Sequence, residues 1–211
     1  MRDNFFVYPV GGEAILVDLI LIRHGATQSN LEGVYYGITD IDLAPQGKKQ
    51  AQRLAALLRD EEITEIYSSP LIRAYRTAKI INQYHHLPIK TSEFIKEMDF
   101  GRWEGLSYRD VEKMWPKEYK KWCDDWIHTP PPEGRAAIEM YQDIKVFLDE
   151  VTGRCAGRVA VVTHHGCIRM MIAHLLGLSI DQCWRFEVCP GSLSRIRWID
   201  EYGVLTALNV T

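Results

Sequence analysis

A short apolar run that stops at a glycine is the strongest constraint on how this chain folds. Residues Leu19–Ile22 lead directly into Arg23, His24 and Gly25. A run of this length, ended by glycine, predicts a buried strand that stops at a loop. In open α/β sheets, functional residues gather outside the carboxyl ends of the strands. We therefore expect Arg23 and His24 at such an end, the first as a fixed cation and the second as a candidate nucleophile or base.

The run Val159–Thr163 repeats this pattern, because it ends in His164, His165 and Gly166. Helices and short strands alternate along the rest of the chain. Helices are predicted at about residues 45–61, 70–84, 136–151 and 167–176, and strands at about 65–69, 87–90, 193–199 and 204–210. This alternation predicts an α/β fold, a three-layer α/β/α sandwich with a mostly parallel central sheet.

The chain is expected to consist of an extension and one domain. Residues 1–18 form the N-terminal extension, in which Gly11-Gly12 marks either a hairpin turn or a loosely ordered segment. Residues 19–211 form a single domain. The stretch at about 97–135 predicts a helical cap inserted into that domain, because it is rich in charged and aromatic residues and contains most of the tryptophans: Trp103, Trp115, Trp122 and Trp126.

Composition narrows the classes of partner and the compartment. The net charge of −3 gives no general attraction to nucleic acid or to an anionic membrane, so neither is expected as a partner. The 5 cysteines contain no CxxC pair, which indicates neither a zinc site nor a disulfide framework. No apolar run approaches the roughly 20 residues of a membrane span, and we find no signal peptide. A cytoplasmic protein is therefore expected.

Three predicted strand ends carry candidate functional residues. The first has Arg23 and His24, the second is followed by Arg73, and the third has His164 and His165. A parallel sheet would place these ends at one edge, where cations and imidazoles converge. Burying such groups together is costly unless an anion joins them, and a phosphoryl group accepts bidentate hydrogen bonds from arginine. The sequence therefore predicts a phosphate site at this edge.

A histidine in such a site attacks phosphorus only in its neutral form. Neighbouring cations would lower the pKa of His24 and keep the ring neutral, and a backbone carbonyl on one ring nitrogen would fix the tautomer. The leaving oxygen also needs a proton donor. The candidates are the acids of the loop that follows residue 89: Glu93, Glu97, Asp99 and Glu104.

Four motifs resemble those of the histidine phosphatase superfamily, which has the phosphoglycerate-mutase-like fold. They are Arg23-His24-Gly25 with Asn30, the stretch Ser68–Ala78 around Arg73, the stretch Glu97–Gly105, and Thr163-His164-x-Gly166. The match runs from about Leu19 to the C-terminus, with all four motifs in order. The resemblance implies hydrolysis of a small-molecule phosphomonoester through a phosphohistidine intermediate, with neither metal nor cofactor.

The resemblance also implies a role for each site residue. His24 is implied as the nucleophile, and Glu97 as the acid that protonates the leaving group and then as the base that activates water. Phosphate binding and transition-state stabilisation are implied for Arg23, Asn30, Arg73 and His164. His165 stands where the family usually has glycine; it either crowds the pocket, adds a phosphate or substrate contact, or is a neighbour without a role.

The later part of the chain resembles bacterial α-ribazole phosphatases. The stretches that carry this likeness are Trp122–Trp126, Leu175–Leu178 and Trp184–Val188 with Gly191-Ser192. Those enzymes remove the 5′-phosphate of α-ribazole phosphate or of a phosphorylated cobamide. A tryptophan-rich cap suits a flat benzimidazole-like base, although aromatic clusters also simply pack a cap onto its domain.

Three alternatives to an α-ribazole phosphatase stay open. They are a phosphoglycerate mutase, a broad-specificity sugar-phosphate phosphatase and a non-catalytic module that binds a phosphorylated ligand. The interval from Glu97 to His164 is short for a mutase, and no implied catalytic residue is missing, as it would be in a binding module. The oligomeric state is not predicted.

Overall fold

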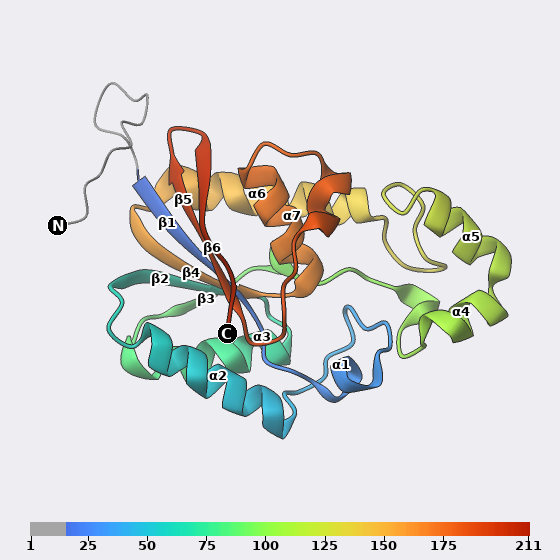
Figure 1. The fold of residues 1–211 in the computed structure, drawn as a ribbon, viewed down its shortest axis with the longest axis horizontal. Helices are drawn as coiled ribbons and strands as arrows, with labels where there is room; N and C mark the ends of the chain where they lie inside the picture. Colours follow the sequence, from blue (N-terminus) through green and yellow to red (C-terminus); the bar gives the residue numbers. More distant parts are fainter. Residues whose placement is uncertain (1–15) are drawn as a thin grey trace.

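Six strands form one sheet in a computed structural model that describes residues 16–211 (Figure 1). The strand order is β3-β2-β4-β1-β5-β6. The parallel strands are β1 (Leu16–Arg23), β2 (Ile63–Ser68), β3 (Ile89–Thr91) and β4 (Gly157–Thr163), whereas β5 (Leu193–Ile199) and β6 (Tyr202–Val210) are antiparallel to their neighbours. The predicted α/β class with a mostly parallel sheet is confirmed.

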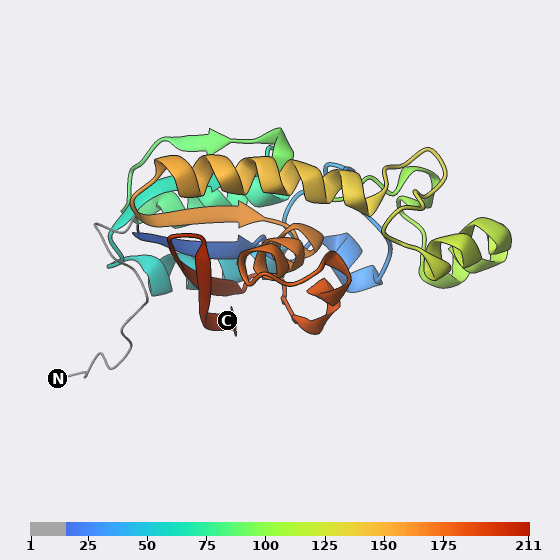
Figure 2. The same cartoon turned by 90° about the horizontal axis from the view of Figure 1, so that it is seen from above.

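Helices cover both faces of this sheet, which gives the three predicted layers (Figures 1 and 2). Helices α6 (Ala137–Arg154) and α7 (His165–Leu175) pack on one face, and α2 (Pro45–Leu58) and α3 (Ile72–Ile81) on the other. The remaining helical segments are α1 (Gln28–Glu32), η1 (Asn82–Tyr84), η2 (Glu93–Ile95), η3 (Gly101–Trp103), α4 (Tyr108–Met114), α5 (Pro116–Asp124) and η4 (Ile180–Arg185).

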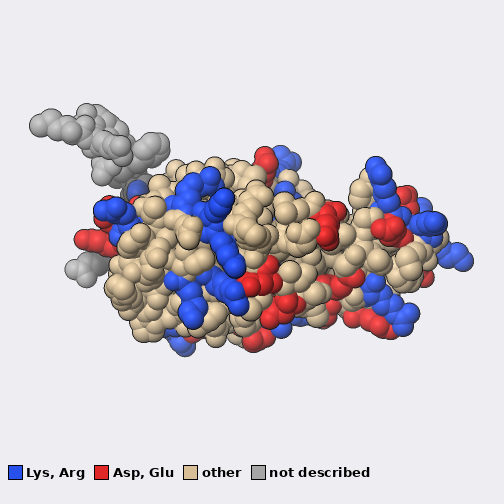
Figure 3. Space-filling view, turned by 90° about the horizontal axis from the view of Figure 1, so that it is seen from below, with Lys and Arg blue, Asp and Glu red and all other residues tan. Residues whose placement is uncertain are grey.

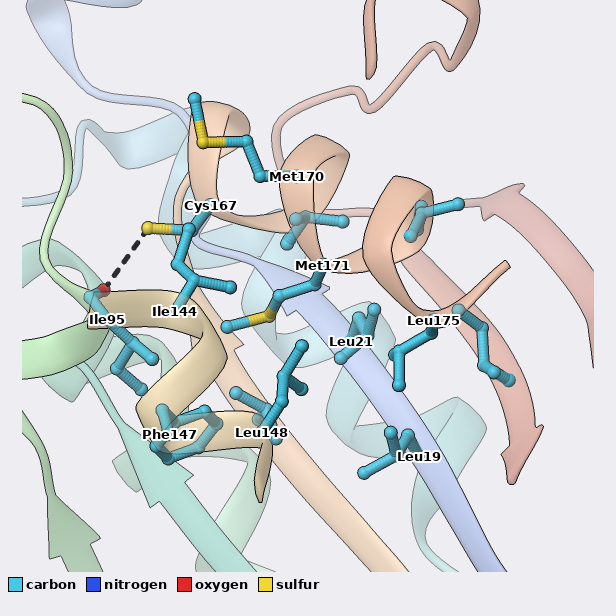
Figure 4. Packing of buried hydrophobic residues seen from close by; sticks show 14 of the residues in the cluster. Leu19, Leu21, Ile95, Ile144, Phe147, Leu148, Cys167, Met170, Met171 and Leu175 are labelled. Atoms are coloured by element: carbon cyan, nitrogen blue, oxygen red, sulfur yellow. Dashed lines mark hydrogen bonds between the residues drawn. The ribbon is translucent and has the colours of Figure 1, made fainter. Parts of the chain in front are cut away.

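The apolar run of β1 exists because the strand is buried on both faces. Leu19 and Leu21 belong to the core beneath α6 and α7, whereas Ile20 and Ile22 belong to the core beneath α2 and α3. Successive side chains of a strand point to opposite faces, so a strand between two helical layers needs an unbroken apolar sequence. Figure 4 shows the first of these cores, in which residues of α6 and α7 surround Leu19 and Leu21.

Some predicted boundaries are wrong. β1 begins at Leu16, so the last three residues of the predicted extension belong to the sheet: Val17 is fully buried and pairs with Gly157 and Trp198. The Gly11-Gly12 turn lies outside the described residues. Helix α7 begins at His165 and not at Cys167, because the backbone turns helical directly after His164.

One apolar residue of α6 does not face the core. Val146 is 51% exposed, whereas the helix buries Met140, Ile144, Phe147 and Val151 among others. At about 100° per residue, Val146 lies about 200° round the helix from Ile144, on the side away from the core.

Helices α4 and α5 lie at one end of the molecule, beyond the carboxyl ends of the parallel strands (Figures 1 and 2). Trp103 is fully buried beneath them, with its ring centroid 5.7 Å from that of Trp122 and 6.1 Å from that of Tyr35. This aromatic cluster joins α5 to the loop after α1. Much of the tryptophan-rich sequence therefore packs the helices of this segment onto the rest of the domain.

The underside of the molecule carries a local concentration of positive charge (Figure 3). Helix α2 exposes three basic side chains, those of Lys48, Lys49 and Arg53. The net charge gives no sign of such a patch, so the expectation that nucleic acid is no partner stays a prediction. None of the described helices is long and apolar enough to cross a membrane.

A residue at the end of β6 is hydrogen-bonded to the loop between η4 and β5. Asn209 has a positive φ of 54°, and its side-chain Oδ1 accepts a hydrogen bond of 2.7 Å from the backbone N–H of Cys189. In the same loop, the carbonyl of Val188 accepts a 2.6 Å hydrogen bond from the guanidinium of Arg23, and Gly191 donates a 2.9 Å hydrogen bond to the carbonyl of His24. The C-terminal strand thus contributes to the placement of Arg23 and His24.

We expect Asn209→Ala to lower the free energy of unfolding by about 1–3 kcal/mol, because alanine loses the bond to Cys189 and tolerates a positive φ poorly. Asn209→Gly loses the same bond without the backbone strain, so its loss should be smaller. Urea denaturation measures both variants, with Thr206→Ala on the exposed side of β6 as the control. Equal stabilities of Asn209→Ala and Thr206→Ala would contradict this role.

Candidate active site

A cavity of about 270 Å³ opens where β1 and β4 end. It is lined by six of the seven predicted site residues: Arg23, His24, Asn30, Arg73, Glu97 and His165. The seventh, His164, lies directly behind, with its ring centroid 5.2 Å from that of His24. The structure therefore brings all seven together.

His24 is held in one tautomer and one protonation state. Its ring is 2% exposed, and Nδ1 lies 2.7 Å from the carbonyl oxygen of Gly25. Because a carbonyl only accepts, Nδ1 carries the proton and Nε2 keeps its lone pair. Burial, followed by the charges of Arg73 and Arg23, lowers the pKa of His24 well below its usual value. The ring is therefore a neutral base at pH 7, as the sequence predicted.

The loop that carries His24 packs against α2 without side chains between the two. A Cβ atom at Gly25 would lie 2.2 Å from the carbonyl oxygen of Gly47, and one at Gly47 would lie 2.1 Å from that of Ala26. Both glycines are needed for this close backbone approach. The contact fixes the chain on the far side of His24.

Arg23 and Arg73 are anchored by backbone carbonyls and not by carboxylates. Arg23 donates to Val188, and Arg73 donates to Thr39 (2.8 Å) and to Gly37 (2.5 Å). The Nε of each guanidinium is buried with no hydrogen-bond partner among the described residues. Burial lowers the pKa of both groups, yet arginine remains charged at pH 7. The site therefore holds two positive charges, and both guanidinium groups have N–H donors that no described residue uses.

His164 is fully buried and oriented by a serine. Its Nε2 lies 2.8 Å from Oγ of Ser69, while its Nδ1 has no partner among the described residues. Burial and then Arg73 lower the pKa of His164 well below its usual value. The sequence marked Ser69 only as part of a motif, because nothing in the spacing connects it to His164, 95 residues later.

His165 lies on the wall of the cavity, which favours a substrate contact over a neighbour without a role. Burial lowers its pKa to about 3, and Arg23 and Arg169 contribute to this shift. The ring is therefore neutral at pH 7 and can donate or accept one hydrogen bond through each nitrogen.

Glu97 is the candidate acid that reaches the cavity. Its carboxylate accepts hydrogen bonds of 3.1 Å from the backbone N–H groups of Met98 and of Gly166 at the start of α7. A Cβ atom at Gly166 would lie 2.6 Å from Oε1 of Glu97, so glycine makes room for the carboxylate. Two residues before Glu97, the carbonyl of Ile95 accepts a 2.6 Å hydrogen bond from the hydroxyl of Thr163. The thiol of Cys167 lies 3.5 Å from the same carbonyl oxygen (Figure 4).

The other three candidate acids have structural partners. Glu104 accepts from the backbone N–H groups of residues 37–39 and of Phe100. Glu93 forms an ion pair with Lys96, and Asp99 accepts from Gly101. The sequence could not separate these roles, because all four acids lie within one short segment.

Asn30 reaches the cavity from α1. Its side-chain oxygen accepts from the backbone N–H (3.0 Å) and the hydroxyl (3.1 Å) of Thr27, which caps the same helix. The oxygen is thus engaged within the helix, and the amide NH₂ is the group left for a ligand.

Aromatic residues form the outer walls of the cavity. The described residues that contribute rings there are Tyr35, Tyr36, Phe100, Trp122, Trp126 and Trp184. Tyr36 also covers the guanidinium of Arg73, whose carbon lies 4.9 Å from the ring centroid. The sequence carried no sign of Tyr36, since the loop of residues 32–40 has no periodicity. Within residues 16–211, no group of three or more His, Cys, Asp or Glu side chains is placed to hold a metal ion.

Stability should fall as the pH falls below about 6.5, because His24, His164 and His165 are neutral in the folded protein and gain protons when it unfolds. Each histidine contributes up to about 1.4 kcal/mol per pH unit below that value, until its folded pKa is reached. Urea denaturation between about pH 7 and pH 5 measures the slope. His165→Asn should reduce it, and an unchanged slope would contradict the buried neutral state.

Known proteins resemble this chain over nearly its whole length. The sequence model of the histidine phosphatase superfamily (branch 1) matches residues 19–211. Phosphoserine phosphatase 1 of Hydrogenobacter thermophilus is 35% identical and aligns over 93% of both chains. The adenosylcobalamin/alpha-ribazole phosphatase of Escherichia coli is 33% identical over 90% of this chain and 95% of its own.

A solved structure has the same fold. The crystal structure of the alpha-ribazole phosphatase from Shigella flexneri matches with a TM-score of 0.86 and 33% identity, over 91% of this chain and 96% of that one. Family and fold thus agree with the motifs and with the site they form. The chain belongs to the histidine phosphatase superfamily and is a phosphatase.

Proposed function

We propose that this phosphatase hydrolyses phosphomonoesters through a phosphohistidine on His24, and that its substrate is α-ribazole 5′-phosphate or a phosphorylated cobamide. The observation that carries the proposal is a buried neutral histidine between Arg23 and Arg73, whose guanidinium groups have no carboxylate partner and keep unused donors. A phosphoryl dianion supplies both the missing charge and the acceptors.

In the first step, Nε2 of His24 attacks phosphorus and the bond to the leaving oxygen breaks. The proton stays on Nδ1, where the carbonyl of Gly25 accepts its hydrogen bond, so the ring becomes a positively charged phosphorylated imidazolium without proton loss. Arg23 and Arg73 stabilise the charge on the phosphoryl oxygens. Glu97, in its protonated form, gives its proton to the leaving oxygen, which departs as an alcohol.

In the second step, the carboxylate of Glu97 takes a proton from water as the water attacks phosphorus. The bond between phosphorus and Nε2 breaks, inorganic phosphate forms, and Glu97 is again protonated. The hydrogen bonds from Met98 and Gly166 hold the carboxylate in place for both steps.

Two lines of support favour an α-ribazole-type substrate. The aromatic outer walls provide flat apolar surface for a benzimidazole-like base. A relative that is 33% identical bears the name adenosylcobalamin/alpha-ribazole phosphatase. A relative that is 35% identical bears the name phosphoserine phosphatase 1, so phosphoserine is the second candidate. A kinetic panel with these substrates, phosphoglycerates and sugar phosphates decides among the candidates, and a bisphosphoglycerate-primed assay tests for mutase activity.

Rapid quench with labelled substrate should trap a phosphoenzyme that is labile in acid and stable in alkali, because the phosphoryl group is bound to nitrogen. His24→Ala should abolish the adduct, whereas His128→Ala, at an exposed histidine paired with Asp125, should retain it. An alkali-labile adduct, or one that persists in His24→Ala, would rule out the proposed intermediate.

Glu97→Gln should slow phosphoryl transfer from an alkyl phosphate by about 10²–10⁴-fold, because the alkoxide then leaves without a proton. Transfer from p-nitrophenyl phosphate should be affected far less, since p-nitrophenolate is a good leaving group. Stopped-flow measurement of the first turnover compares the two substrates, with Glu93→Gln as a matched control outside the cavity. Equal losses with both substrates would show that Glu97 is not the acid.

A further inference from the structure

Arg169 is a cation of the cavity that the two chemical steps do not use. It lies on α7, one turn after His165, and lines the same space as Arg23 and Glu97. Arg169 forms no ion pair with any carboxylate of residues 16–211; its contacts are a backbone carbonyl and an aromatic ring.

Those two contacts fix the guanidinium without neutralising it. The Nε of Arg169 donates a 2.7 Å hydrogen bond to the carbonyl of Phe186, and the guanidinium carbon lies 5.0 Å from the ring centroid of Trp184. Trp184 in turn meets Trp126 edge-on, with the centroids 5.4 Å apart. The hydrogen bond uses one of the five N–H groups, so both terminal nitrogens keep their donors for a ligand.

Charge balance in the cavity indicates what that ligand is. Three arginines line it: Arg23, Arg73 and Arg169. A phosphoryl dianion brings about two negative charges. The proposed first step uses Glu97 as an acid, so in that step it brings no negative charge, and burial keeps the three histidines neutral. About one positive charge is therefore left without a partner when a substrate with a single phosphate is bound.

We propose that Arg169 is a second anion subsite, which binds a carboxylate or phosphate group carried by the leaving group of the substrate. The planar guanidinium suits the paired oxygens of either group. Trp184 covers one face of it, and the hydrogen bond to Phe186 uses only Nε, so the two terminal nitrogens keep their donors. This inference rests on the proposed function and narrows its substrate class to phosphomonoesters with a second negative charge.

An anion subsite at Arg169 favours different candidate substrates from those that the aromatic walls favour. Phosphoserine carries a carboxylate near its phosphate, and a phosphorylated cobamide carries a phosphodiester on the ribose. Free α-ribazole 5′-phosphate has no second anion, so it would leave Arg169 unpaired. A guanidinium would bind the carboxylate of phosphoserine and the phosphodiester of a cobamide in the same way, so matched substrates are needed to distinguish them.

The test compares substrates that differ only in the second anion. O-phosphoserine and O-phosphoethanolamine form the carboxylate pair, and adenosine 3′,5′-bisphosphate and adenosine 5′-phosphate form the ribose-phosphate pair. In at least one pair, the anionic member should have a kcat/KM higher by about 10–100-fold, mostly through KM. Arg169→Met should remove this preference, and Arg169→Lys should keep part of it. The pair that responds identifies the anion.

Arg185→Met is the matched control, because this substitution removes the same charge from a residue outside the cavity. Arg185 is exposed and follows Trp184 in the sequence. It should retain the wild-type preference. No preference in either pair, or equal loss for both members of a pair in Arg169→Met, would overturn the subsite. Calorimetric binding of the same pairs to His24→Ala tests the subsite without turnover, so a failure of the phosphohistidine mechanism is seen separately.

Discussion

Positive charge that is buried without a carboxylate partner governs this structure. Arg23 and Arg73 are tied to carbonyl oxygens, which orient a guanidinium but leave its charge intact. An aspartate in place of those carbonyls would neutralise the site and remove its affinity for anions. The same charges, together with burial, keep His24 and His164 neutral. One electrostatic arrangement therefore both binds a phosphoryl group and preserves the lone pair that attacks it.

Holding such charges together requires a rigid frame, and the sheet provides it. β1 and β4 are buried on both faces, and their hydrogen-bonded ladder continues to the backbone of His24, which donates to Thr163 at 3.0 Å. The antiparallel hairpin of β5 and β6 adds a second support, because Asn209 holds the loop whose carbonyls bind Arg23. Segments from both ends of the chain thus fix one cation.

Sequence reasoning succeeded where the physical signal is local. The run Leu19–Ile22 gave a doubly buried strand, because burial on both faces leaves no room for polar residues. It could not choose among the four candidate acids, Glu97 included, since their roles depend on which side chains meet after folding. Tyr36, Ser69 and Arg169 were missed as parts of the site for the same reason: each gains its role from a residue far away in the chain or in a loop without a pattern.

The sequence by itself determined the α/β layers, the family and the identity of the seven candidate site residues. The apolar runs, the polar residues that follow them and the motifs are all local patterns, formed by residues close together in the sequence. Only the tertiary structure decided how those residues act on one another. It put the proton of His24 on Nδ1, set Ser69 against His164, seated Glu97 at the start of α7, and left Arg169 without a carboxylate. These are contacts across the cavity, and their energies depend on distances and burial that exist only once the chain is folded.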